Sequence, residues 1–253
     1  MKQIYLYSLI LFFIVTIFLS CKGPTGPEGL QGQAGPKLKG NIQGFVTLVN
    51  SDGSQPIDRS GISVSIDSSS ISTITGADGK FILSDLETGI YTINYSKSSY
   101  GSSKIVQYQF VGGGTVTLER VYLCQPPNFT VTIDSIKWMD GLEFGIYTTL
   151  SEHISGWRWV IFFIGQSPNV SSNPVYYLNT SDGYESYFNN GQGMQKTSSS
   201  WFMGFVSGDT AYIKAYSANK SEINSGYIDI NTGRFVYTNL NPISSNVISV
   251  IIP

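Results

Sequence analysis

The sequence contains little of the chemistry that most enzymes and nucleic-acid-binding proteins need. It has one histidine, His153, and only 13% of its residues are charged, with a net charge of −2 at pH 7. One histidine cannot supply a two-histidine zinc site, and His153 lies in a polar segment without a nucleophile elbow. So low a charge provides no basic surface for nucleic acid. We therefore expect no catalysis, no cofactor, no metal ion and no nucleic-acid partner; a hydrolase built on the C-terminal half is the least favoured alternative.

Helix-forming residues and long apolar runs are also scarce. Alanine and leucine are sparse, whereas Gly, Ser, Thr, Asn, Tyr and Ile dominate, and this bias favours strands joined by tight turns. After residue 19 no apolar run approaches transmembrane length, and the best one, 159–164, has the length of a strand. Apolar residues recur with a period of two rather than 3.6. The sequence thus predicts an all-β protein of two tandem β-sandwiches that follow a signal peptide and a tether.

The N-terminus has the pattern of an exported, lipid-anchored protein. A basic start is followed by an apolar run over 4–19, which predicts a signal peptide over 1–20. Leu19-Ser20-Cys21 resembles the lipobox of bacterial lipoproteins, and this resemblance implies that Cys21 carries acyl chains that hold the protein on a membrane. Lys22, in place of an aspartate, favours the outer membrane of the cell envelope. Cleavage by an ordinary signal peptidase, with Cys21 unmodified, is the alternative.

Residues 21–37 are predicted to form a short tether. Glycine falls at every third position from Gly23 to Gly35, which resembles collagen. So few triplets cannot hold a stable triple helix, so we predict an extended spacer and a monomeric protein. A trimer formed through this collagen-like repeat is the alternative.

Residues 38–123 are predicted to form the first sandwich. The segments 75–81 (Thr-Gly-Ala-Asp-Gly-Lys-Phe) and 83–93 (Leu-Ser-Asp-Leu-Glu-Thr-Gly-Ile-Tyr-Thr-Ile) resemble the carboxypeptidase regulatory-like domain. This resemblance implies a seven-stranded sandwich of the transthyretin type that serves as a non-catalytic accessory module. Asp78-Gly79 predicts a tight turn, and the three glycines at 112–114 predict a hairpin turn.

Residues 124–127 are predicted to be a linker, because they contain a Pro-Pro pair, and 128–253 to be the second sandwich. The segment 208–219 (Gly-Asp-Thr-Ala-Tyr-Ile-Lys-Ala-Tyr-Ser-Ala-Asn) resembles the late strands of fibronectin type III domains, which implies an immunoglobulin-like fold. Ala211 replaces the corner tyrosine of that family, so the hydrogen bond of that tyrosine is lost. If Cys21 carries lipid, Cys124 is expected to be a buried apolar thiol or to pair with another molecule.

Aromatic residues give the one indication of a binding site. Trp157 and Trp159 share a strand face, which suits either a core or a stacking platform. Tyr184, Tyr187 and Phe188 lie in a Gly- and Asn-rich stretch, 182–193, that we predict to be an exposed loop. We therefore select Tyr184, Tyr187 and Phe188 as candidate ligand contacts.

These features predict a lipid-anchored cell-envelope protein with a binding, adhesion or scaffolding role. Its expected partners are the membrane, through the N-terminal lipid, and a protein or glycan ligand. The alternative that the aromatic stretch supports is a carbohydrate-binding accessory lipoprotein of a polysaccharide uptake system.

Overall fold

The computed structural model describes residues 35, 37–139, 143–153, 155–181, 184–220 and 225–253. The predicted signal peptide, Cys21 and most of the predicted tether lie outside the described residues. Residues Lys37–Pro253 form one compact unit. Within the described part, strands account for all regular structure except η1 (Ser199–Phe202), a single 3₁₀ turn, and the all-β prediction is confirmed. None of the helical structure described there is long and apolar enough to cross a membrane.

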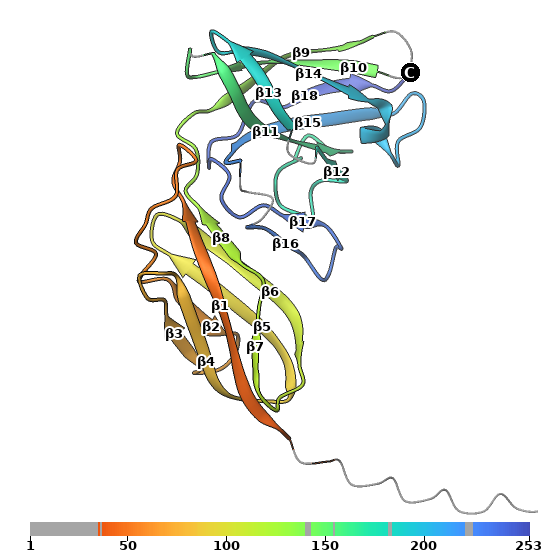
Figure 1. The fold of residues 1–253 in the computed structure, drawn as a ribbon. Helices are drawn as coiled ribbons and strands as arrows, with labels where there is room; N and C mark the ends of the chain where they lie inside the picture. The colour runs from red at the N-terminus through yellow and green to blue at the C-terminus, as the bar shows by residue number, and fades with distance from the viewer. Residues whose placement is uncertain (1–34, 36, 140–142, 154, 182–183, 221–224) are drawn as a thin grey trace, which may run out of the picture. The chain divides into compact units, whose positions relative to one another are not determined.

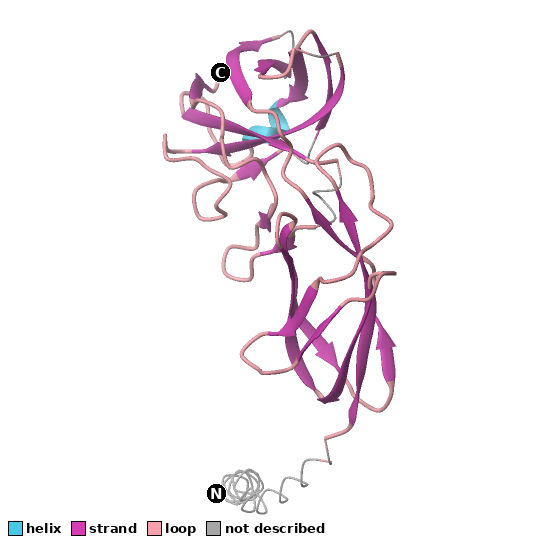
Figure 2. Ribbon diagram, turned by 90° about the vertical axis from the view of Figure 1, so that its left-hand side faces the viewer, coloured by secondary structure: helices cyan, strands magenta, loops and turns pink. Residues whose placement is uncertain are grey.

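The first sandwich consists of two four-stranded sheets that face one another (Figures 1 and 2). One sheet has the order β4-β1-β7, with β8 also pairing with β1, and the other has the order β3-β2-β5-β6. Inward residues alternate with outward ones on each strand and meet in one apolar core between the sheets. The strands are β1 (Lys39–Val49), β2 (Ser63–Ile66), β3 (Ser72–Ile74), β4 (Lys80–Glu87), β5 (Gly89–Lys97), β6 (Gly101–Phe110), β7 (Thr115–Thr117) and β8 (Val121–Cys124).

Two glycine turns of the first sandwich differ in what they connect. Gly79 turns the chain into β4 as predicted, with a φ of +80°, and a Cβ there would lie 2.2 Å from the Val46 carbonyl oxygen. Gly112 and Gly113 also have positive φ, but the predicted hairpin is wrong. The chain crosses here from β6 in one sheet to β7 in the other, where β7 pairs in parallel with β1. A glycine-rich pattern thus predicts where the chain turns, but it does not predict which strand the following strand will pair with.

The second sandwich contains a long sheet of order β18-β15-β11-β13-β14-β10-β9 that turns over at the short β13–β14 hairpin. Side chains from β9, β10, β11, β13 and β15 meet those of the η1 turn in one apolar core. The strands are β9 (Val131–Trp138), β10 (Glu143–Leu150), β11 (Gly156–Gly165), β13 (Tyr184–Asn189), β14 (Gln192–Ser198), β15 (Thr210–Ala218) and β18 (Ile248–Ile251), with the two-residue β12 (Asn179–Thr180) beside β11.

One asparagine side chain joins the two layers of the second sandwich. Asn246 lies just before β18, and its side chain accepts from the Ile133 backbone N–H at 2.9 Å and donates to the Ile133 carbonyl at 3.0 Å. This amide thus satisfies both backbone groups of Ile133 on β9, as a neighbouring strand would. The sandwich is closed along this side by a side chain.

A second apolar cluster covers part of the outer face of the second sandwich. It contains residues of β11, of β15, of the loop before β12, and of the segment that holds the hairpin β16 (Tyr227–Ile228) and β17 (Phe235–Val236). Its buried members are Ile161, Phe163, Val170, Tyr177, Tyr216, Ala218 and Tyr237. The strand β11 is consequently buried on both faces over its C-terminal half. Its N-terminal half extends beyond this cover.

The predicted linker is held by hydrogen bonds. Cys124 ends β8 and is fully buried. The Asn241 side chain donates to the carbonyl of Pro127 at 2.8 Å and to that of Phe129 at 3.0 Å. Beyond the linker, the Nζ of Lys104 on β6 lies 4.2 Å from the centre of the Tyr227 ring on β16. The two sandwiches therefore contact one another at several points within the compact unit.

Candidate functional site

The candidate site lies where the cover over β11 ends. Odd-numbered residues of β11 point to the outer face of the sheet. Ile161 and Phe163 are fully buried there, Trp159 is partly buried at the edge of the cluster, and Trp157 is 59% exposed. Burial thus decreases along the strand toward its N-terminal end, and the row ends on an exposed indole. A large exposed aromatic ring on a regular strand is a common feature of binding surfaces.

The neighbouring strand β13 supports this row. Trp157 pairs with Tyr187 and Trp159 pairs with Glu185 across the antiparallel ladder, so all four side chains lie on the same face. The rings of Trp157 and Tyr187 meet edge to face, with centroids 5.5 Å apart and planes inclined at 76°. Tyr187 therefore braces the Trp157 ring, which reduces the rotamer freedom that a ligand would otherwise have to restrict.

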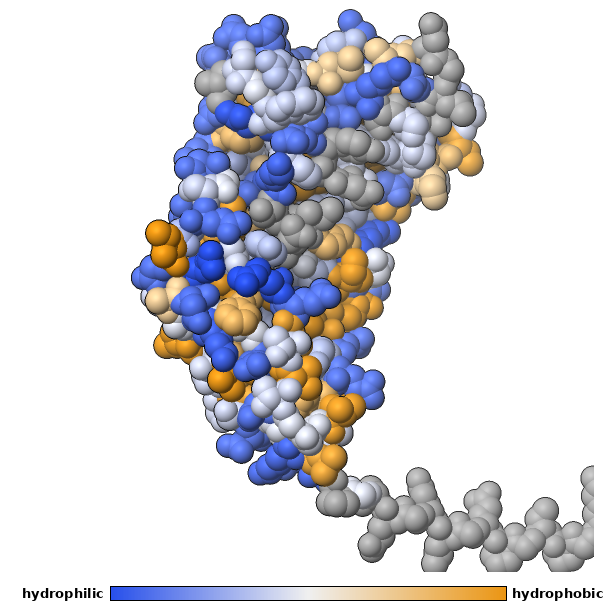
Figure 3. Space-filling view, in the orientation of Figure 1, coloured by the Kyte–Doolittle hydropathy of each residue, from blue (hydrophilic) through white to orange (hydrophobic). Residues whose placement is uncertain are grey.

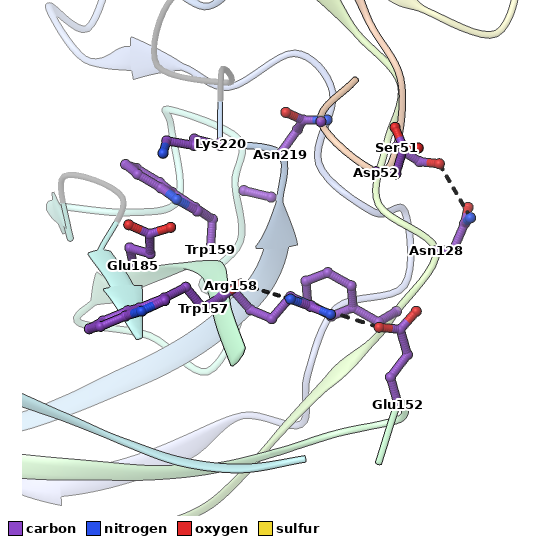
Figure 4. A pocket seen from close by; sticks show the side chains of 13 residues that line it. Ser51, Asp52, Asn128, Glu152, Trp157, Arg158, Trp159, Glu185, Asn219 and Lys220 are labelled. Carbon is purple, nitrogen blue, oxygen red and sulfur yellow. Dashed lines mark hydrogen bonds and ion pairs between the residues drawn. The ribbon is translucent and has the colours of Figure 1, made fainter. Parts of the chain in front are cut away.

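A cleft of about 530 Å³ opens beside the two tryptophans (Figure 4). This volume lies within the range typical of small-molecule sites. The lining comes from six parts of the chain: the β1–β2 turn of the first sandwich, the segment before β9, the β10–β11 turn, the start of β11, β13, and the end of β15. The lining residues are Ser51, Asp52, Gly53, Asn128, Phe129, Glu152, Trp157, Arg158, Trp159, Glu185, Ala218, Asn219 and Lys220.

Polar groups at the cleft are fixed by hydrogen bonds and one ion pair. Arg158 Nη1 donates to the Trp157 carbonyl at 2.8 Å, and its Nε lies 3.8 Å from Glu152 Oε2. Both partners of that pair are partly exposed, so the attraction is weak and its main effect is to position the guanidinium. The buried side chain of Asn219 donates to the Asn50 carbonyl at 2.7 Å.

The charges at the cleft are mixed, with an excess of carboxylates. Asp52, Glu152 and Glu185 supply three negative charges, and Arg158 and Lys220 supply two positive charges. Hydrogen bonds from the Ser54 hydroxyl and backbone N–H lower the pKa of the Asp52 carboxyl below its ordinary value, so this group is ionised at neutral pH. Carboxylates and amides beside exposed rings are able to bind a ligand that has both hydroxyl groups and an apolar face.

The structure separates the predicted contact residues. The stretch that contains them was predicted to be an exposed loop, and this prediction is wrong, because Tyr184–Asn189 form β13 and Gln192 begins β14. Phe188 is 1% exposed and belongs to the core of the second sandwich. Tyr187 is 55% exposed and braces Trp157 from outside the cleft lining. The backbone of Tyr184 pairs with that of Val160, and its role as a ligand contact stays a prediction.

One signal in the sequence could have identified this strand, and one residue concealed it. Asn190-Gly191 is a two-residue turn with φ values of +50° and +78°, which is the signature of a tight hairpin. Ser186 is a polar residue at an inward position, which interrupts the apolar alternation expected of a strand. Its hydroxyl is nevertheless buried and donates to Gln195 Oε1 at 2.5 Å. Because that bond satisfies the hydroxyl, a serine fits the inward face between two aromatic positions.

Among the residues that the structure describes, His153 and the acidic side chains show no arrangement that would hold a metal ion. His153 is exposed in the turn after β10. In the described part of the chain, no three residues among His, Cys, Asp and Glu come close enough together to bind one. A second hollow, of about 440 Å³, lies between Tyr177, Asn179, Trp201 and Arg234, but it exposes no ring comparable with Trp157.

Comparisons with known proteins give only distant structural matches. No family model and no curated protein matches the sequence. A DUF3823 family protein from Parabacteroides merdae is 13% identical, covering 85% of this chain and 100% of that chain, with a TM-score of 0.33. A proposed carbohydrate-binding protein from Bacteroides uniformis is 11% identical with the same coverage and a TM-score of 0.29.

A shorter match is to a type II cohesin–X-dockerin complex from Acetivibrio cellulolyticus, which is 23% identical over 30% of this chain, with a TM-score of 0.27. The match spans about half of that chain, 51% of its length. At these identities and TM-scores, none of the three proteins indicates a ligand for this one.

Proposed function

We propose that this protein binds a saccharide chain, without catalysis, in the cleft beside Trp157 and Trp159. The observation that carries the proposal is the exposed Trp157 ring, 59% accessible, at the edge of a cleft with fixed carboxylate and amide groups. A pyranose ring has an apolar face of C–H groups and an edge of hydroxyl groups. An indole stacks against the first, and carboxylates and amides bind the second.

The proposal includes a location. A predicted signal peptide and the lipobox-like Leu19-Ser20-Cys21 support a lipid-anchored protein of the cell envelope, held on the outer membrane through Cys21. The Gly-x-y segment that follows would then act as a spacer between the anchor and the sandwiches. In this setting a binding site for saccharides would serve the capture of glycans, as an accessory to a polysaccharide uptake system.

The binding experiment uses titration calorimetry with soluble cello-, xylo-, manno- and malto-oligosaccharides. Trp157→Ala should weaken binding of the best oligosaccharide by about 2 kcal/mol, because a central aromatic anchor is lost. Trp157→Phe, which keeps a smaller ring, should lose less. Tyr176→Ala is the matched control, because Tyr176 is 53% exposed and lies outside the cleft lining. If all three variants bind equally well, saccharide binding in this cleft is refuted.

The anchor is tested separately by Cys21→Ala in a Gram-negative host. The variant should move from the membrane fraction to the soluble fraction, and the wild-type mature N-terminus should carry the mass of acyl chains. A wild-type protein without that mass, with membrane partition unchanged by the substitution, would refute lipid anchoring and leave the cleft proposal intact.

A further inference from the structure

We infer that the β1–β2 turn of the first sandwich forms part of the ligand site, with the Asp52 carboxylate accepting a hydrogen bond from an uncharged saccharide. This inference rests on the proposed function and deepens it. The first sandwich would then determine specificity, and would not be only a support for the second. Three structural features carry the inference: the rigidity of the turn, its attachment to the second sandwich, and the charge of the cleft.

The turn that presents Asp52 is closed by its own hydrogen bonds. The Asn50 N–H donates to the Ser54 carbonyl at 2.8 Å, and the Gly53 N–H donates to the Asn50 carbonyl at 2.9 Å. The Asn50 side chain also donates to Ser54 Oγ at 2.9 Å. Gly53 has a φ of +84°, a conformation that few other residues adopt easily. The position of Asp52 is therefore fixed before any ligand arrives, which reduces the entropy lost on binding.

The second sandwich and the linker hold this turn at the cleft. Asn219, at the end of β15, donates to the Asn50 carbonyl at 2.7 Å, although the two residues are 169 positions apart. Asn128 Nδ2 donates to Ser51 Oγ at 3.3 Å, and the Ser51 N–H donates to Gln125 Oε1 at 3.1 Å. Figure 4 shows Asn219 and Asn128 on either side of the turn. The turn is thus a wall of the cleft in the protein without ligand.

The Asp52 carboxylate has an oxygen available for a ligand. The Ser54 N–H donates to Oδ1 at 2.9 Å and the Ser54 hydroxyl donates to the same oxygen at 2.6 Å. Both bonds end on Oδ1, so Oδ2 is left to accept from a hydroxyl group of the ligand. The tryptophan rings lie on β11 and the carboxylate lies on the turn of the other sandwich. A ligand that occupies the cleft can therefore stack on one side and donate a hydrogen bond on the other.

The charges of the lining favour an uncharged saccharide over an acidic one. Three carboxylates line the cleft, and of the two cations Arg158 is already paired with Glu152. An acidic sugar would meet Asp52 and Glu185 with only Lys220 to balance them, and like charges at short range oppose binding. Neutral hexose or pentose chains carry no such cost.

The test compares Trp157→Ala, Asp52→Ala, Asp52→Asn and Asp58→Ala in the full chain. Asp58 is the matched control, because it is an exposed first-sandwich aspartate whose Oδ1 accepts from the Ser60 N–H at 2.9 Å, and it lies outside the cleft. The probes are the neutral oligosaccharides named above and oligogalacturonates of equal length. Asp52→Ala should weaken neutral binding about tenfold to a hundredfold, as expected for a hydrogen bond to a charged group. Asp58→Ala should leave it unchanged.

The outcomes separate this inference from the proposed function. Weaker binding in Trp157→Ala and Asp52→Ala, with Asp58→Ala unchanged, supports both. Weaker binding in Trp157→Ala alone, with both Asp52 variants like wild type, overturns the role of Asp52 and leaves saccharide binding intact. Oligogalacturonates that bind more tightly than neutral chains overturn the charge argument. If none of the probes binds the wild type, the proposed function fails and this inference fails with it. Asp52→Asn guards against misfolding, because it keeps an oxygen for Ser54.

Discussion

Phe188 and Tyr187 are neighbours on β13 whose substitution should lower the free energy of unfolding by very different amounts. Phe188 is 1% exposed, and its ring covers Gly193 on β14, where an added Cβ would lie 2.5 Å from the ring atom Cε1. Phe188→Ala removes this ring from the core of the second sandwich, and such truncations cost about 3–5 kcal/mol of unfolding free energy. Tyr187 is 55% exposed, and its main partner is the Trp157 ring. Tyr187→Ala should cost about 1 kcal/mol, the usual contribution of an aromatic pair.

Urea titration followed by tryptophan fluorescence measures this difference directly. All four tryptophans of the chain, Trp138, Trp157, Trp159 and Trp201, belong to the second sandwich, so their emission reports the unfolding of that part. The midpoint for Phe188→Ala should fall well below that of Tyr187→Ala, with similar slopes. A cost below about 1 kcal/mol for Phe188→Ala, or equal costs for the two variants, would refute the placement of β13.

Three further contrasts test the fold. Gly79→Ala should destabilise the first sandwich by about 3 kcal/mol, because its Cβ would lie 2.2 Å from a backbone oxygen. Gly53→Ala, which has a similar φ but open space around its Cβ, should cost about 1 kcal/mol. Near-UV circular dichroism measures the unfolding of both variants. Tyr95→Phe should raise the free energy of unfolding by about 1 kcal/mol, because the Tyr95 hydroxyl is buried with no partner in the described structure. Tyr91→Phe should lower it, because the Tyr91 hydroxyl loses its 2.8 Å hydrogen bond to the Glu87 carbonyl. Asn246→Ala should cost about 1–3 kcal/mol by tryptophan fluorescence, because both backbone groups of Ile133 lose their partner, and Asn246→Asp should not recover this loss, because a carboxylate oxygen would face the Ile133 carbonyl in place of the amide donor.

Tyr95 also gives the pH dependence a definite sign. Burial raises the pKa of its hydroxyl above the ordinary value of 10.0. The unfolded chain therefore releases this proton first, so the free energy of unfolding falls as the pH rises above 10.0. The decline should be smaller in Tyr95→Phe than in wild type when both are titrated with urea at alkaline pH. An equal decline in the two proteins would mean that Tyr95 is not buried in the folded state.

The sequence was most informative where burial follows a strict alternation. Val64 and Ile66 face the core from β2, and Ile93 and Tyr95 from β5, as a period of two requires. Alternation alone does not determine which strands become neighbours. For this reason the glycines at 112–114 were correctly assigned to a turn and incorrectly to a hairpin.

The β13 strand could not be found by alternation of apolar residues, because Ser186 stands at one of its inward positions. Its pattern becomes regular only when the bond from Ser186 to Gln195 is known, and Gln195 lies on the next strand. The cleft was equally hidden. Asp52 and Asn219 are brought near the tryptophans by tertiary folding, and no spacing in the sequence connects these positions. Of the residues that line the cleft, the sequence had singled out only Trp157 and Trp159.

Trp159 is partly buried and Trp157 is exposed, so the pair lies between the two interpretations considered for it, a core and a stacking platform, and binding on such a platform stays a prediction. A strand that passes from beneath a covering layer to an open face must change from buried to exposed along one row of side chains. Ile161 is fully buried, Trp159 is partly covered, and Trp157 is exposed. Side chains without a polar group, such as Ile161 and Phe163, suit the covered part, whereas a tryptophan suits the boundary, because it can pack with one side and leave the other accessible. The exposed ring is thus anchored by its place in a continuous apolar row, and a ligand that stacks on Trp157 would extend the cover of the sheet by one more position.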